Sequence, residues 1–313
     1  MTNFIFCKGN YNNPFPLENP DKTPPKPLLM GPGMRLWLLI ALYIACLLVL
    51  VMLSKLESFT WLSAGEEGGF PVNYGRFGLA LYGIICFAIP ALVYANIFPY
   101  ERFQWFKLQI RVEPVAALYG IAAILVSLLG LEFLLEWLMN NVYDQELRDA
   151  QKALEEDYKW LLAMPAFSDL VILLFTSAFI PAICEELFFR AGIQQLLMEW
   201  LKKPHLCISI TAVTFALFHY NPAELPVYFL AGLMLGYAFC WTGSLRINFL
   251  MHFMFNASIL FRLYIIEHNP ALKNWEPGPF ISLAGFALAA LFMYLLYRNS
   301  RKPLKGISSG NIY

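Results

Sequence analysis

The chain has 313 residues, of which 59% are hydrophobic and only 14% are charged. This composition is too apolar for an ordinary soluble domain. The formal net charge is zero, and this argues against a basic surface that binds nucleic acid.

Long apolar runs recur along the chain and predict an all-α polytopic membrane protein with a buried active-site cavity, since a helix needs about 20 apolar residues to cross a bilayer. Eight spans are predicted, at 36–53, 77–98, 115–139, 169–199, 206–220, 226–241, 246–266 and 280–297. The fifth and sixth are short, so neighbouring helices must bury them or they must be tilted little. The domain organisation follows as a Pro-rich tail (1–35), a transmembrane domain (36–297) and a basic tail (298–313).

Lys and Arg are concentrated in the two tails and in the loops on their side of the predicted spans. By the positive-inside rule both termini are expected in the cytoplasm. On the opposite side, residues 144–163 carry leucines at helical spacing among charged residues. Two interpretations of this segment stay open, an amphipathic helix on the outer interface or a solvated connector.

Ionisable residues inside a predicted span are the most informative feature of the sequence, because they are costly there and commonly mark functional sites. The run Glu185-Glu186 with Arg190 follows an uncharged stretch too short to cross a bilayer, so the helix must continue through these residues. Glu186 and Arg190 are four residues apart and lie on nearly one helix face, which predicts a structural ion pair. Glu185 points elsewhere without a sequence-local cation, and a carboxylate in that position suits general acid–base catalysis.

The chain has four histidines, and two of them fall in predicted spans. His219 ends the fifth span, and His252 lies in the seventh with Asn256 one turn later on the same face. Polar groups on an apolar helix need polar partners. These residues and Glu185 therefore predict one shared site between helices, and a purely structural polar network is the alternative.

The ordered motifs E-E-x-x-x-R, F-x-x-x-H and H-x-x-x-N resemble those of the CAAX protease and bacteriocin-processing (CPBP, or Abi) family, with a motif-bearing core at about 169–260. The family includes type II CAAX prenyl proteases and bacterial members linked to bacteriocin processing or self-immunity. The resemblance implies that Glu185 is the catalytic glutamate, with His219 beside it, and that His252 and Asn256 stabilise the oxyanion. It also implies an integral protein of the plasma membrane, in bacteria the inner membrane, whose partners are membrane lipid and a peptide or lipidated protein substrate.

The chemistry of these residues fits an intramembrane endopeptidase, because peptide hydrolysis needs a deprotonated water, a stabilised oxyanion and a protonated leaving amine. Family members are commonly called metalloproteases, and a zinc ion held by Glu186, His219 and His252 is one alternative to a metal-free glutamate mechanism. Two other functions stay open. One is a non-catalytic scaffold or bacteriocin-immunity protein that binds peptide in the same cavity, and the other is a transporter that uses Glu185 as a proton carrier.

Overall fold

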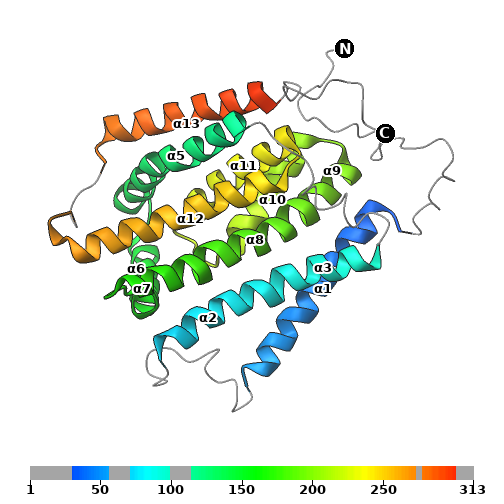
Figure 1. Cartoon of the computed structure of the whole chain (residues 1–313), viewed down its shortest axis with the longest axis horizontal. Helices are drawn as coiled ribbons and strands as arrows, with labels where there is room; N and C mark the ends of the chain where they lie inside the picture. The colour runs from blue at the N-terminus through cyan, green and yellow to red at the C-terminus, as the bar shows by residue number, and fades with distance from the viewer. Residues whose placement is uncertain (1–29, 56–70, 99–113, 273–276, 301–313) are drawn as a thin grey trace.

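The structure is a computed structural model that describes residues 30–55, 71–98, 114–272 and 277–300. Within these ranges the chain is built of helices and connecting segments, with no strand (Figure 1). The predicted all-α fold is confirmed. The predicted tails fall largely on residues 1–29 and 301–313, which lie outside the described ranges.

The helices are mostly regular, with three short π-helical segments (η3, η4 and η5) and one 3₁₀ turn (η6). The elements are, in chain order, α1 (Pro32–Leu53), α2 (Val72–Gly83), η3 (Ile84–Ala88), α3 (Ile89–Ile97), α5 (Pro114–Asn141), α6 (Gln145–Leu162), α7 (Phe167–Leu173), η4 (Leu174–Phe179), α8 (Ile180–Glu186), η5 (Leu187–Gln194), α9 (Gln195–Leu201), α10 (Pro204–Leu217), α11 (Leu225–Thr242), α12 (Leu245–His268), η6 (Pro270–Leu272) and α13 (Pro279–Ser300).

Seven helices of the described chain are long and apolar enough to cross a membrane, where eight spans were predicted. They are Pro32–Leu53, Val72–Ile97, Pro114–Asn141, Phe167–Leu201, Leu225–Thr242, Leu245–His268 and Pro279–Ser300. The predicted span at 206–220 is instead α10, a helix of 14 residues. At about 1.5 Å per residue α10 is roughly 21 Å long, which is less than the bilayer core of about 30 Å. The prediction of eight full spans is therefore corrected to seven spans and one short apolar helix.

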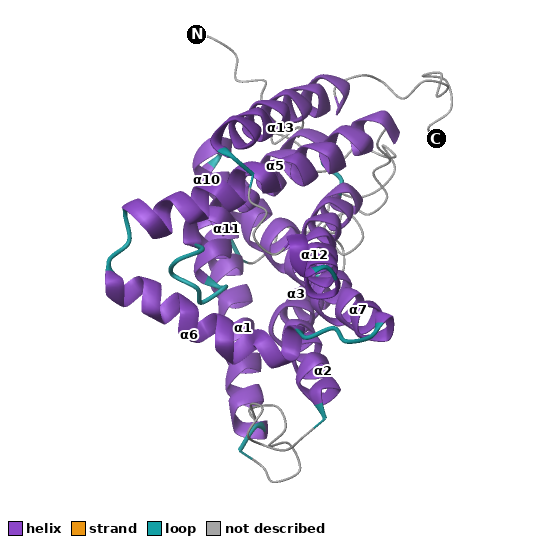
Figure 2. Cartoon of the chain, turned by 90° about the vertical axis from the view of Figure 1, so that its left-hand side faces the viewer, coloured by secondary structure: helices purple, strands orange, loops and turns teal. Residues whose placement is uncertain are grey.

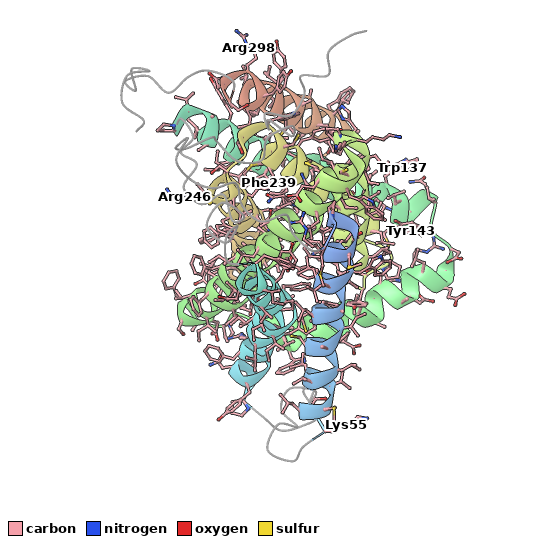
Figure 3. The ribbon with its side chains drawn as sticks, turned by 90° about the vertical axis from the view of Figure 1, so that its right-hand side faces the viewer. Lys55, Trp137, Tyr143, Phe239, Arg246 and Arg298 are labelled. Carbon is pink, nitrogen blue, oxygen red and sulfur yellow. The ribbon has the colours of Figure 1, made fainter. Side chains whose placement is uncertain are left out.

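The helices that carry the predicted motifs lie in the middle of the bundle. In Figure 1, α13 and α5 run side by side along one edge, and α1, α2 and α3 lie along the other. Between them, α12 packs against α5, α11 and α8. Side chains fill the space between the helices, with Phe239 of α11 inside and Lys55 and Arg298 at the periphery (Figure 3). The acidic motif on α8 and the histidine motif on α12 are therefore neighbours.

Two long helices contain a π-helical segment directly before a proline. Pro90 follows η3 and Pro181 follows η4. Proline has no N–H, and its ring crowds the carbonyl four residues earlier, which belongs to Cys86 in the first case and to Ser177 in the second. A wider π-helical turn accommodates both effects without ending the helix. The second helix therefore continues from Phe167 to Leu201, as the sequence predicted.

The amphipathic segment predicted at 144–163 is the helix α6, which begins with Asp144 accepting a hydrogen bond from the Leu147 N–H at 2.9 Å. Figure 1 places α6 and α7 beside the same ends of α8 and α12, and Figure 2 shows α6 crossing that end of the bundle. Arg76 of α2 is buried and donates to the Leu161 carbonyl oxygen at 2.9 Å and to Asp169 Oδ1 at 2.7 Å. The end of α6 is thus fixed to the transmembrane helices.

Candidate active site

Glu186 is the centre of a fully buried polar network between α8, η5 and α12. One oxygen, Oε2, accepts hydrogen bonds from Arg190 Nε and from Asn248 Nδ2, each at 3.0 Å. The other, Oε1, lies 3.0 Å from His252 Nδ1. Glu186 and Arg190 are both 0% exposed. The predicted ion pair is present, and its carboxylate is occupied by three donors.

Glu185, the adjacent carboxylate, lacks such hydrogen-bond donors in the described chain. Its side chain keeps 15% exposure, and its Oε2 atom is buried without a hydrogen-bond partner among the described residues. The His252 Nε2 atom lies 3.8 Å from Glu185 Oε2. This distance exceeds that of a hydrogen bond. Glu185 is therefore the acid of the pair that is free to bind a water molecule.

His252 lies between the two glutamates and is 3% exposed. Since the Glu186 carboxylate accepts at Nδ1, the proton of the neutral imidazole is on Nδ1 and Nε2 faces Glu185. Glu186 thereby fixes both the ring orientation and the tautomer of His252. The helix α12 brings this side chain into the site because its buried face contains Asn248, His252 and Phe255.

His219 joins the same site from the connection between α10 and α11. Its Nδ1–H donates to the Phe215 carbonyl oxygen at 2.8 Å, which leaves Nε2 as the proton-accepting atom of the neutral ring. The Phe215 ring lies 4.7 Å from the His219 ring and 5.7 Å from the His252 ring, between ring centroids. Glu185 and His252 are close enough to His219 to act on it electrostatically. The Phe215 ring contacts both histidine rings, and Glu185, His219 and His252 lie within electrostatic range of one another.

The short length of α10 explains how His219 reaches the depth of Glu185. The helix Phe167–Leu201 has 35 residues and is about 52 Å long, so it extends well beyond a bilayer core of about 30 Å. The helix α10 starts near its extended end, at Pro204, and runs back alongside. Nearly equal lengths of helix then separate Glu185 and His219 from that end.

Asn256, the fourth predicted site residue, lies one turn beyond His252 on α12 and is partly exposed. Its side chain makes no hydrogen bond to another described residue. Its predicted oxyanion role concerns an atom of the substrate and stays a prediction.

Two residues of the site were missed in the sequence. Asn248 is 0% exposed and donates to Glu186 and to the Leu235 carbonyl oxygen at 2.8 Å. It lies four residues before His252, and this helical spacing was a usable signal. The Tyr228 ring stacks on His219 with 3.9 Å between centroids and 21° between planes, and nothing in the local sequence indicates that contact.

The zinc alternative does not fit this arrangement. Among the described residues, no three His, Cys, Asp or Glu side chains are grouped so that they would hold a metal ion. Glu186, one of the three predicted ligands, already accepts hydrogen bonds at both oxygens, and His252 directs Nδ1 to it. A zinc ion needs from each ligand a free lone pair about 2 Å away, and the free His252 nitrogen, Nε2, is on the other side of the ring from Glu186.

A cavity of about 540 Å³ lies alongside α12, lined mainly by apolar side chains between Phe253 and Ile266 of α12, with Leu174 of η4 and Leu272 of η6. Its lining begins at the residue after His252 but includes none of the polar site residues. The polar site itself is almost enclosed, since Glu186 and His252 are at most 3% exposed. The cavity and the polar site therefore share the helix α12, but none of the polar site residues lines the cavity.

The comparison with known families identifies the part of the chain that carries the site. The family described as Rce1-like, type II CAAX prenyl endopeptidase Rce1-like, matches residues 167–258. This stretch runs from α7 into α12 and contains all the motifs on which the resemblance rested, so that resemblance is confirmed. No curated protein and no solved structure matches the chain.

Proposed function

Because residues 167–258 match the Rce1-like family of type II CAAX prenyl endopeptidases, we propose that the chain is an intramembrane endopeptidase in which Glu185 activates the attacking water. One observation carries this proposal. Of two adjacent glutamates, Glu186 is occupied by three donors, while Glu185 Oε2 is buried without a partner and faces His252. A purely structural network would leave no reason for a buried, unpartnered carboxylate.

The positions of these groups support the following reaction. Glu185 accepts a proton from water as the water oxygen attacks the peptide carbonyl carbon, and the carbonyl becomes an oxyanion. His219, with Nε2 free to accept a proton, shares the proton transfers with Glu185. Collapse of the oxyanion breaks the C–N bond, and the proton taken from water is given to the leaving amine. The step needs no covalent intermediate with the chain.

His252 and Asn256 are the proposed oxyanion donors. The amide of Asn256 is free of partners in the described chain, and His252 donates from Nε2 when that nitrogen is also protonated. Donors fixed before the reaction stabilise developing charge effectively in an almost dry site. Glu186 acts indirectly, since it holds the His252 ring in place.

The substrate we propose is a membrane-associated peptide with an attached lipid, of the CAAX prenyl type named by the family. The apolar cavity along α12 supports this, because a lipid chain or an apolar peptide segment can enter it. The lipid also concentrates the peptide in the bilayer.

The test uses the full chain in lipid vesicles and a fluorogenic CAAX peptide with and without a farnesyl group. We expect the farnesylated peptide to be cleaved faster. Glu185→Gln should lower kcat about 10²- to 10⁴-fold, the usual contribution of general acid–base catalysis. Glu199→Gln is the matched control on the same long helix, because Glu199 pairs with Arg35 away from the site. Turnover by Glu185→Gln at the wild-type rate would refute the proposed role of Glu185.

Binding of the same peptides distinguishes the scaffold alternative. A peptidase binds the farnesylated peptide in both forms and loses only turnover in Glu185→Gln. Tight binding without cleavage by the wild-type chain would instead favour a non-catalytic peptide-binding protein.

A further inference from the structure

We propose that Tyr228 and Glu224, held from α6 by Gln151, are positioning residues for His219. This inference rests on the proposed function, in which His219 transfers protons. It gives the surface helix α6 a role in the reaction, although α6 lies outside both the motifs and the residues that match the family.

The first observation is the stacking of Tyr228 on His219. The two rings are nearly parallel, with centroids 3.9 Å apart. The Phe215 ring lies against His219 at 60°, so the imidazole is held by aromatic rings from α10 and α11. Among the described residues, the side chain of His219 makes one hydrogen bond, from Nδ1 to the Phe215 carbonyl oxygen. The tilt of the ring about that bond, and hence the direction of Nε2, is set by the aromatic contacts.

The second observation is that Tyr228 is itself held. Its side chain interacts electrostatically with Glu224, which lies four residues earlier and precedes the first turn of α11. Gln151 of α6 donates from Nε2 to Glu224 Oε1 at 3.2 Å and to Glu155 Oε1 at 2.9 Å. Gln151 is 3% exposed, although α6 is otherwise mostly polar and exposed. Because Gln151 is buried on a mostly exposed helix, its side chain serves a specific contact and does not interact mainly with solvent.

A third contact connects α6 with the same loop. The Tyr143 hydroxyl, just before α6, donates to the Ala223 carbonyl oxygen at 2.8 Å. Arg148 of α6 donates to the Tyr143 carbonyl oxygen and to the Met139 carbonyl oxygen. Two consecutive residues of the loop, Ala223 and Glu224, are therefore held from the α6 side. The loop also contains Tyr220 in the left-handed region, at φ 52°, a conformation that a bulky residue keeps only when its surroundings hold it.

The consequence is a continuous path from α6 to the proposed proton acceptor. It runs from Gln151 through Glu224 and Tyr228 to His219. A displacement of about 1 Å of a catalytic group can lower a rate 10²-fold. Loss of the stacking ring should therefore lower kcat more than it changes KM, since these residues do not belong to the proposed substrate cavity.

The test compares Tyr228→Leu, Tyr228→Phe and Gln151→Ala in the full chain in vesicles. Tyr228→Leu removes the stacking ring and should lower kcat about 10- to 100-fold, with KM within about 2-fold. Tyr228→Phe keeps the ring and loses only the hydroxyl, so it should recover most of that loss. Gln151→Ala should lower kcat about 3- to 10-fold. Two controls match these changes. Tyr237→Phe alters the second His–Tyr pair, with His205, and Gln145→Ala alters an exposed glutamine of the same helix.

A second measurement needs no turnover. With only four histidines, ¹⁵N spectra of histidine-labelled protein report the tautomer of each ring. Wild-type His219 should carry its proton on Nδ1. Tyr228→Leu should broaden or double the His219 signals, because the ring can then tilt about its Nδ1 hydrogen bond, while the His252 signals stay unchanged. This effect would support the positioning role even if the chain cleaved no peptide. The positioning role would be overturned if Tyr228→Leu and Gln151→Ala both kept the histidine spectra and the kcat of the wild-type chain. If Tyr228→Leu fails to fold, Gln151→Ala decides by the same two readouts.

Discussion

Exchanging Glu185 and Glu186 one at a time for glutamine should separate catalysis from stability at neighbouring positions. Glutamine has nearly the same shape as glutamate, so each change removes charge and replaces one acceptor oxygen by a donor. At Glu186 that oxygen faces only donors, and the buried Arg190 loses its counter-ion. At Glu185 no partner is lost.

The magnitudes follow from burial. Glu186 and Arg190 are both 0% exposed, and removing one partner of a buried ion pair costs about 3–5 kcal/mol. A folded domain is stable by only about 5–15 kcal/mol, so Glu186→Gln should lose a large share of its stability. Glu185→Gln should change stability by less than about 1 kcal/mol while losing most of its turnover. The additional change Arg190→Gln should restore part of what Glu186→Gln loses, because the unpaired charge is then gone.

Stability is measured by unfolding the purified chain with increasing SDS in mixed micelles, with tryptophan fluorescence as the signal. Activity is measured separately as peptide cleavage in vesicles. Equal stability of Glu186→Gln and the wild-type chain would refute the buried network. Recovery in the double variant tests the ion pair separately from the other hydrogen bonds of Glu186.

Four further outcomes are expected. Asn248→Ala should destabilise the chain by about 1–3 kcal/mol in the same unfolding assay, because it removes buried hydrogen bonds to Glu186 and to the α11 backbone; an unchanged midpoint would contradict this. Gly232→Val should reduce cleavage, because a Cβ there already meets Ala212 Cα at 3.1 Å and would push α10, with His219, away from α11. Gly285→Ala crowds the Val126 carbonyl oxygen at 2.9 Å, so it should lower stability but leave the kcat of the folded fraction unchanged. Treatment with a chelator should leave the cleavage rate of the purified chain unchanged, since both Glu186 oxygens already accept hydrogen bonds; loss of activity that zinc restores would show that this inference is wrong.

The sequence alone determined the features that depend on local geometry. Apolar runs of sufficient length predicted the membrane helices, and the i, i+4 spacing predicted that Glu186 pairs with Arg190 and leaves Glu185 free. The helix α6 was also expected, as one of two alternatives, from its leucine spacing. Each of these follows from the period of a helix, which a single segment contains in full.

The tertiary structure decided the features that depend on contacts between helices. The sequence placed His219 at the far end of a short fifth span without fixing its depth, whereas in the structure α10 is too short to cross and starts from an extended neighbouring helix. Asn248 enters the network only because α12 packs against α8, and Tyr228 reaches His219 only through the turn between α10 and α11. The relative depth and packing of helices depend on side chains far apart in the chain, and no local period encodes them.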